Sequence, residues 1–350
     1  MRDPFDRIPL ELFEEGSQKY PSIEMIFEKR IKRLVRRGLT FFELPRIYQW
    51  MIVGGNIAQQ KLSTLDSALT FISGKNAKLD KKIREIARLE SDPEMFRLLT
   101  ELLVIHRILR SQIANFEYEE PVQGSLTKFD INVDFEGRRI RVDVTHKEDV
   151  YPLEATAERI RTNLRYADPN CGGDIQYAAP AKQNYGDGTV TLSRDMTEAE
   201  VKETIRNAVE VASSLKSGTA TVPCFSPFFQ IILNRESATW TGGSGGTWYS
   251  PNINGYLKSI QKKADKSKKI ADRSYKIIAV DFVPGSDFND GSYYRDELKR
   301  RLLQLNPATS STIDEVVSFS MRFENDRFEN LGLLWKRDPS SPSVFIQLLQ

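Results

Sequence analysis

Two aspartates, Asp130 and Asp143, are spaced so that a β-hairpin would place them side by side. The segment 128–147 alternates apolar and polar residues on both sides of Glu136-Gly137, which predicts two strands joined by a two-residue turn. In that register the two aspartates are directly opposite, with Cβ atoms ~4.5–5.5 Å apart. Like charges at this distance repel unless a cation or a proton lies between them. The spacing is therefore compatible with a bound cation or a shared proton at this position.

The polar face of this hairpin holds further reactive groups. Thr145 and Lys147 follow Asp143 on the same face, because side chains alternate along a strand. One face would then carry two carboxylates, a hydroxyl and an ammonium group. The alternative is an exposed, solvated face on which Arg139 and Arg141 neutralise the acids. The hairpin taken by itself favours that plainer interpretation.

A third carboxylate, Glu101, lies in a segment that reads as a helix from about residue 91 to Arg110. Ser91 and Glu94 form a capping box around Pro93, which is a strong signal for a helix start. Glu101 stands among apolar residues of this helix. It is either the partner of Arg97 one turn earlier or an acid brought over the hairpin.

Two predicted helices carry dense positive charge. The first spans 22–37 and presents basic residues on its polar face, among them Arg30, Arg33 and Arg37. The second spans 252–271 and holds a run of lysines that includes Lys262 and Lys263. Such faces are either solvated or bind nucleic-acid phosphates, and solvated faces are the commoner case.

Composition limits the classes of function. The chain has 350 residues, 40% hydrophobic and 28% charged, with a net charge of +2, so any basic surface must be local. The two histidines and two cysteines, His106, His146, Cys171 and Cys224, lack the closely spaced pairs of the usual four-ligand Cys/His zinc site. No apolar run approaches ~18 residues, and the acidic N-terminus lacks the core of a signal peptide. We expect an intracellular, cytoplasmic protein.

The remaining pattern predicts an α/β protein with a mixed sheet. Residues 1–90 read as an N-terminal helical region, and 91–350 as an α/β domain with a poorly patterned stretch at about 150–250. A helix follows the capping box of Thr197 and Glu200, and residues 240–248 read as a glycine-rich loop. Strands are expected at 189–192, 228–233, 275–283, 316–323, 331–336 and 343–349.

The segments TELLVIHRIL, KFDINV and RVDVTHK, in that order, resemble the PD-(D/E)XK nuclease superfamily. Its restriction-endonuclease-like core has the order αβββαβ. Glu101 matches the carboxylate of the first helix, Asp130 the Asp of the second strand, and Asp143 the acid of the (D/E)-x-K motif. Phe129 stands where proline is usual and Thr145 where the lysine is usual. The resemblance covers about 94–147 and extends to the lysine-rich helix and the strand at 275–283. Residues of about 150–250 do not align with the family and would be an insertion or an embellishment.

The resemblance implies a metal-dependent nuclease. Asp130, Asp143 and Glu101 would hold Mg²⁺ or Mn²⁺, and Lys147 would orient or deprotonate the attacking water. Lys262 or Lys263 is the alternative source of the missing lysine. DNA would be held by Arg30, Arg33, Arg37 and the lysines from Lys262 to Lys269. A homodimer would suit double-strand cleavage, although no stretch requires one. Thr145 favours the alternative, a catalytically inactive scaffold that binds nucleic acid or a protein partner.

Overall fold

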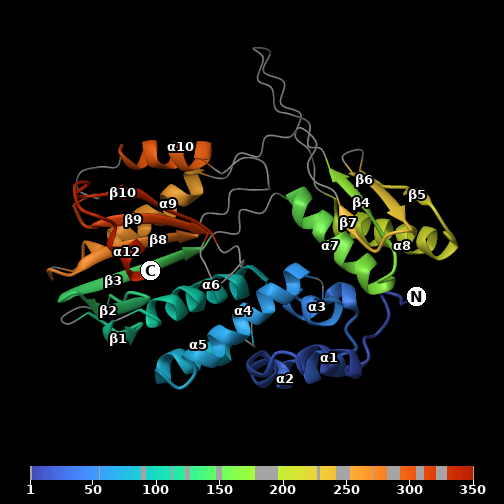
Figure 1. The fold of residues 1–350 in the computed structure, drawn as a ribbon, viewed down its shortest axis with the longest axis horizontal. Helices are drawn as coiled ribbons and strands as arrows, with labels where there is room; N and C mark the ends of the chain where they lie inside the picture. Colours follow the sequence, from blue (N-terminus) through green and yellow to red (C-terminus); the bar gives the residue numbers. More distant parts are fainter. Residues whose placement is uncertain are drawn as a thin grey trace, which may run out of the picture. The chain divides into compact units, whose positions relative to one another are not determined.

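The structure is a computed structural model of the chain (Figure 1). It describes residues 2–349 apart from 55, 87, 89–91, 112, 123–126, 147–151, 178–195, 227–228, 242–252, 271, 282–291, 305–310 and 321–328. The chain divides into two compact units. Unit 1 comprises residues 1–16, 31–55 and 150–249, and unit 2 comprises 17–30, 56–149 and 250–350. Both units combine helices with a mixed sheet, so the chain belongs to the α/β class.

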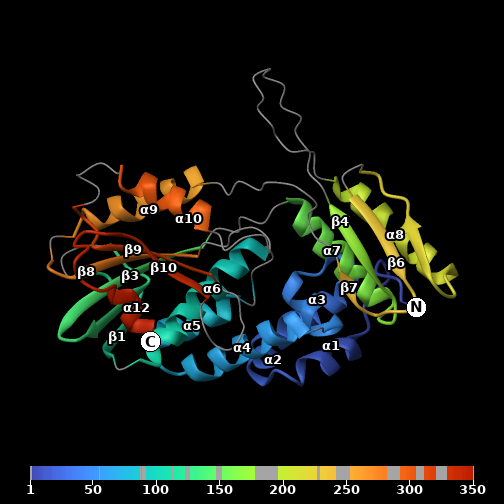
Figure 2. The same ribbon diagram turned by 45° about the horizontal axis from the view of Figure 1, so that its top comes forward.

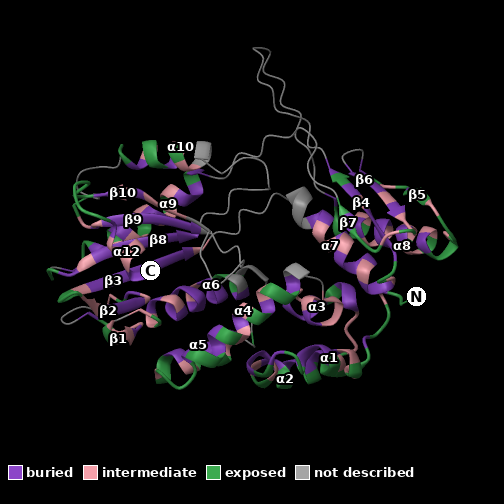
Figure 3. Ribbon diagram, viewed as in Figure 1, coloured by how far each residue is buried: buried purple, intermediate pink, exposed green. Residues whose placement is uncertain are grey.

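Unit 2 is built on a six-stranded sheet in the order β1-β2-β3-β8-β9-β10. β1, β2 and β3 form an antiparallel meander, β3, β8 and β9 are parallel, and β10 returns antiparallel to β9. The strands span Ala114–Tyr118, Ile131–Phe135, Arg138–His146, Tyr275–Asp281, Glu315–Ser320 and Glu329–Lys336. The central strands are buried almost throughout (Figure 3).

Helices cover both faces of this sheet. α6 (Asp92–Leu109) packs on the face that also carries α12 (Val344–Leu349), and α9 (Ile253–Ser267) and α10 (Ser292–Leu302) pack on the opposite face (Figure 2). The strand alternation agrees with this arrangement, because Asp143 of β3 contacts α9 whereas His146 contacts α6. The expected helix 91–110, the hairpin, the lysine-rich helix and the strand at 275–283 are all present.

Residues Val344–Leu349 form helix α12, so the strand predicted at 343–349 is wrong. Glu315 of β9 is fully buried and accepts hydrogen bonds from the Ser343 hydroxyl and from the Val344 N–H. The Ser343 hydroxyl also accepts a hydrogen bond from the Ile346 N–H in the first turn of the helix. A buried carboxylate at the first turn supplies the acceptors that a helix N-terminus lacks, and its charge complements the helix dipole.

Unit 1 contains a four-stranded sheet in the order β5-β6-β4-β7. The strands span Thr219–Val222, Phe229–Asn234, Gly172–Tyr177 and Trp240–Thr241, with α7 (Pro152–Ala167) and α8 (Glu198–Ser214) as the helices. The predicted capping box of Thr197 is confirmed. Strand β4 was not among the strands expected from the sequence. Its Gly173 approaches Ile232 O so closely that an added Cβ would lie 2.4 Å from it. The strand expected at 189–192 and most of the loop expected at 240–248 lie outside the described residues, and Trp240 and Thr241 form β7.

The N-terminal helices are divided between the two units. They are α1 (Leu10–Ser17), α2 (Pro21–Arg36), η1 (Phe41–Glu43), α3 (Arg46–Val53), α4 (Asn56–Ile72) and α5 (Ala77–Ile86). α4 packs against α6 in unit 2, and α3 packs against α7 in unit 1. Within the part of the chain that the structure describes, no helix combines the length and apolar character that a membrane span needs.

Candidate active site

The hairpin places the two aspartates as its sequence predicted. Pairs run from Phe135↔Arg138 to Ile131↔Val142, so Asp130 and Asp143 come next on the two strands. The register depends on a tight turn in which Glu136 and Gly137 both have positive φ, 49° and 74°. That combination is typical of a type I′ turn, whose twist matches that of the flanking strands. The structure confirms this register.

Asp130 reaches across the hairpin to the backbone of β3. Its Oδ2 accepts the Val144 N–H at 2.7 Å. The carboxylate therefore takes the place that a strand carbonyl would occupy if the β2–β3 ladder continued. This bond fixes the acid at the point where β2 begins and β3 runs on.

Two lysines of α9 bind the acidic pair. Lys263 Nζ lies 3.3 Å from Asp130 Oδ2 and 3.3 Å from Asp143 Oδ1. Lys266 Nζ lies 2.6 Å from the same Asp143 oxygen. The helix buries Ile260, Ala264 and Ser267 against the sheet, which turns the neighbouring positions 263 and 266 toward the acids.

Burial dominates the electrostatics of this cluster. Asp143 is 0% exposed, and burial raises the pKa of its carboxyl, with the Asp130 charge adding to the effect and the two lysines opposing it. Burial alone would lower the pKa of Lys263, but Asp130 and Asp143 together outweigh it and raise that pKa. Two carboxylates and two ammonium groups therefore balance one another's charge.

Glu101 lies beside Asp130 as a neutral acid. The Tyr118 hydroxyl of β1 donates a hydrogen bond of 2.6 Å to its Oε1. Burial raises the pKa of Glu101 to about 8 and the Asp130 charge adds to this, although the Tyr118 bond acts in the other direction. At neutral pH the Glu101 side chain is thus mostly protonated, and it takes its hydrogen bond from Tyr118 rather than the predicted ion pair with Arg97.

The other predicted residues fall into three groups. Lys262, Arg33 and Arg37 are exposed, as contacts to a phosphate backbone require. Arg30 is only 9% exposed, so it does not fit the solvated, phosphate-contacting face that the sequence predicted. This side of α2 is buried because Arg30 stands among Phe27, Ile31 and Leu34, which are themselves buried.

Lys147 lies outside the described residues. Thr145 is buried, and its hydroxyl has no hydrogen-bond partner within the described residues.

Sequence reasoning missed a second polar cluster at the same end of the sheet. His146 ends β3 and Asp281 ends β8, and the two residues pair across the parallel strands. Their side chains form a 2.5 Å contact beside Thr100 of α6. The strand ending in Asp281 was predicted, but its pairing with β3 depends on a long-range register that composition does not reveal.

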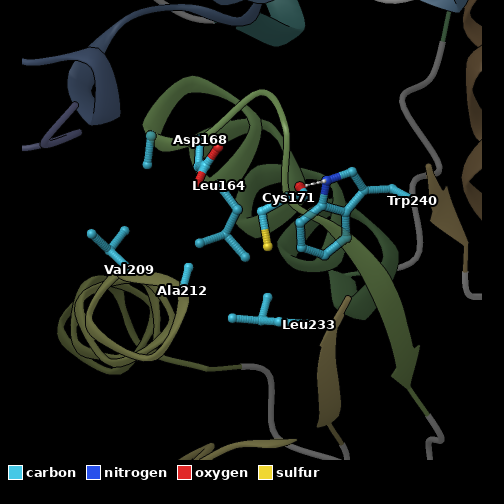
Figure 4. A pocket seen from close by; sticks show the side chains of 8 residues that line it. Leu164, Asp168, Cys171, Val209, Ala212, Leu233 and Trp240 are labelled. Atoms are coloured by element: carbon cyan, nitrogen blue, oxygen red, sulfur yellow. Dashed lines mark hydrogen bonds between the residues drawn. The ribbon is translucent and has the colours of Figure 1, made fainter. Parts of the chain in front are cut away.

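Unit 1 has one small hollow next to Trp240, which donates to the Cys171 carbonyl at 3.1 Å (Figure 4). Its lining is mainly apolar, from Leu164, Ala167, Asp168, Cys171, Val209, Ala212, Leu233 and Trp240. It has no room for a water molecule. The hollow is therefore a packing feature of the unit 1 core.

In the portion of the chain that the structure describes, no three His, Cys, Asp or Glu residues are grouped so as to hold a metal ion. The acidic pair of Asp130 and Asp143 thus provides two carboxylates around one shared ammonium group. A search against family models, curated proteins and solved structures gave no significant match.

Proposed function

We propose that unit 2 is a metal-dependent nuclease that hydrolyses phosphodiester bonds in DNA on a divergent restriction-endonuclease-like core. The element order α6, β1, β2, β3, α9, β8 supports this proposal. The acids on the first helix, the second strand and the third strand support it as well. The observation that carries the proposal is Lys263, which bridges two opposed aspartates.

Two features of the acidic pair would suit a divalent cation, although the described residues include no group of three ligands. Opposed carboxylates need positive charge between them, and Asp143 Oδ2 is buried without a hydrogen-bond partner among the described groups. Asp130, Asp143 and Glu101 would hold Mg²⁺ or Mn²⁺, since Mg²⁺ is bound by one or two carboxylates and keeps several waters. When bound, the ion would activate a water and stabilise charge on the scissile phosphate.

The basic residues supply the remaining functions. Lys263 and Lys266 bring two positive charges to the acidic pair, where they would stabilise the charge that develops on the phosphate. Lys258 and Lys262 lie on the exposed face of α9, and we assign them to the DNA backbone. Arg33 and Arg37 belong to unit 1, so their predicted contact with DNA stays a separate prediction. Lys147 keeps its predicted role in orienting the water.

A second candidate function is a non-catalytic scaffold that binds nucleic acid. Two observations favour it. Lys263 and Lys266 already neutralise the acidic pair, so the fold needs no metal to satisfy these charges. Thr145 replaces the motif lysine and is buried. Such a protein would bind DNA in a salt-dependent manner without cutting it.

The test is cleavage of supercoiled plasmid and of circular single-stranded DNA with Mg²⁺, Mn²⁺ or EDTA. The wild type is compared with Asp143→Asn and with Asp134→Asn, a matched control on the same hairpin whose carboxylate pairs with Arg139 instead. We expect metal-dependent cutting that falls at least ~100-fold in Asp143→Asn, as for loss of one electrostatic group, and that persists in Asp134→Asn. Linear product formed without a nicked intermediate would indicate a homodimer.

Cutting that survives in Asp143→Asn would refute this site. If the wild type binds DNA but cuts neither substrate with either metal, the scaffold function holds instead. Binding is measured by fluorescence anisotropy across a salt series, where phosphate contacts give a linear fall of log affinity with log salt.

A further inference from the structure

The cluster of Thr100, His146 and Asp281 takes no part in binding the acidic pair. His146 Nδ1 lies 2.5 Å from Asp281 Oδ2, and Thr100 Oγ1 lies 3.2 Å from the same nitrogen and 3.4 Å from the same oxygen. Thr100 and Asp281 are fully buried, and the His146 side chain is 10% exposed. A buried carboxylate is costly unless it is paired and hydrogen-bonded, and His146 and Thr100 supply these contacts to Asp281.

The contact fixes which imidazole nitrogen carries the proton. An ionised carboxylate only accepts hydrogen bonds, so Nδ1 must donate to Asp281. The neutral ring then has its lone pair on Nε2. Within the described residues, this Nε2 is buried and has no hydrogen-bond partner. A buried acceptor without a donor costs free energy, which indicates that a donor such as water occupies this place in the working protein.

The cluster lies three residues beyond Asp143 along β3 and on the opposite face of the sheet, where His146 contacts α6. The β2 ladder stops at Ile131↔Val142, whereas β3 continues to His146 with pairs to β8. Residues 143–146 are therefore beyond the paired part of β2. α6 ties the two groups together, because Thr100 contacts His146 and the next residue, Glu101, interacts with Asp130.

Unsatisfied polar atoms gather at this end of the sheet. Asp143 Oδ2, Thr145 Oγ1, His146 Nε2 and Asp281 Oδ1 are all buried without a hydrogen-bond partner in the described part of the chain. Ligands of open α/β sheets bind outside the carboxyl ends of the parallel strands, and β3 and β8 end here. A purely structural cluster would be expected to satisfy its polar atoms internally.

We propose that His146 accepts the proton of the water that attacks the phosphodiester, with Asp281 and Thr100 as its positioning residues. The inference rests on the proposed nuclease function and assigns to His146 the role left open by Thr145. The water oxygen forms a bond to phosphorus while its proton passes to Nε2. The bond from phosphorus to the leaving oxygen breaks with its electron pair, and that oxygen takes a proton from bulk water. His146 then returns its proton to solvent.

The first experiment does not depend on activity. The chain has only two histidines, His106 and His146, so a long-range ¹H–¹⁵N spectrum of the imidazole rings is simple, and His106→Gln assigns it. We expect His146 to be protonated on Nδ1 in the wild type, with a strongly deshielded proton. Asp281→Asn should abolish that deshielding. A wild-type ring protonated on Nε2 would overturn the inference.

The second experiment measures single-turnover cleavage by His146→Asn, Lys147→Gln, Asp281→Asn and the His106→Gln control. A general base contributes about 10²–10⁴-fold, so His146→Asn should lose at least ~100-fold with DNA affinity and Mn²⁺ affinity unchanged. Asp281→Asn should lose less, since the base remains but its orientation is lost. Circular dichroism and thermal unfolding establish that each variant is folded.

The outcomes separate this inference from the nuclease proposal. If the wild type cuts and Asp143→Asn does not, but folded His146→Asn cuts at the wild-type rate, the inference fails and the nuclease remains. Loss of cutting in Lys147→Gln with full activity in His146→Asn would likewise refute the inference and return the role to Lys147. If the wild type does not cut at all, the nuclease proposal fails and the assignment of His146 fails with it.

Discussion

Individual residues of the candidate site differ in charge although they share a chemical type. Asp143, Asp130 and Glu101 are all carboxylic acids at one end of one sheet. Asp130 and Asp143 share Lys263, whereas Glu101 is bonded to a neutral phenol. Glu101 therefore retains a proton at neutral pH, and its ionisation would require a further cation.

Replacement of Glu101 by Gln should change how stability depends on pH. A carboxyl whose pKa rises from 4.5 unfolded to about 8 folded makes folding less favourable as pH rises through that interval, because the unfolded chain releases the proton first. Glu101→Gln cannot ionise and keeps its full stability. Each pKa unit is worth about 1.4 kcal/mol, so the difference should reach a few kcal/mol by pH 9.

The measurement is urea unfolding of the EDTA-treated protein at pH 5, 7 and 9. The wild type should lose stability across this range relative to Glu101→Gln, whose curve should stay closer to flat. Glu119→Gln, an exchange of a nearby acid that pairs with Lys82, is the control and should follow the wild type. Parallel curves for the wild type and Glu101→Gln would show that Glu101 is ionised in the folded protein.

Lys263 should compete with a divalent cation for the acidic pair. Its ammonium lies 3.3 Å from an oxygen of each aspartate, so Lys263→Gln would leave two facing carboxylates with less compensation. We expect Mn²⁺ to bind about tenfold more tightly in this variant, because removing a competing interaction worth about one pKa unit changes an affinity about tenfold. Titration calorimetry measures the Mn²⁺ affinity of each protein. As a control, Lys262→Gln removes the neighbouring exposed lysine and should leave the Mn²⁺ affinity unchanged. Equal affinities in the wild type and both variants would contradict competition between Lys263 and the cation.

At the level of elements, the hairpin turn determines whether the acids meet. Glu136 adopts φ 49°, a left-handed conformation that glutamate rarely takes and that asparagine tolerates better. Glu136→Asn should therefore stabilise unit 2 by about 0.5–1 kcal/mol, and Gly137→Ala, at φ 74°, should destabilise it by about 1 kcal/mol or more. Thermal unfolding measures both. Equal midpoints for the two variants would show that the turn does not have this geometry in solution.

The elements predicted correctly carry local signals. The hairpin has strict alternation and a two-residue turn, and α8 has a complete capping box. The errors occur where local signals are weak or opposed by tertiary contacts. Gly172 and Gly173 weaken the strand signal of β4, although they allow close strand contact. Residues 344–349 are a short apolar run that fits a strand or a helix equally well, and buried Glu315 decides for the helix.

The candidate site was predictable to the extent that it is local. Asp130 and Asp143 follow from one hairpin, and Glu101 from one helix. Lys263 was one of several candidates because only the packing of Ile260 and Ala264 selects it. The contacts of His146 with Asp281 and of Lys266 with Asp143 join residues more than a hundred positions apart. They depend on the parallel register of β3 with β8, which no local pattern encodes.

At the level of the whole molecule, the chain alternates between two units rather than passing through them in turn. It changes unit near residues 16, 30, 55, 149 and 249. The core of unit 1 consequently joins Phe42, from the N-terminal region, with Ala157 and Ile205, from the segment 150–249. Phe42 also lies under the Arg159 guanidinium at 3.9 Å. Residues 150–249 are thus not an independent insertion, because part of their core comes from elsewhere.

This arrangement predicts a local effect of Phe42→Ala. Truncation of a fully buried phenylalanine costs about 3–5 kcal/mol, and the loss should be confined to unit 1 because Phe42 packs in its core. Hydrogen exchange of the whole chain should show lost protection in α7, α8, β4 and β6 and unchanged protection in β3 and β8. Phe225→Ala, at a position 55% exposed in the same unit, should change little. Equal loss in both units would show that they unfold as one cooperative structure, and unit 2 would then depend on the core of unit 1 for stability.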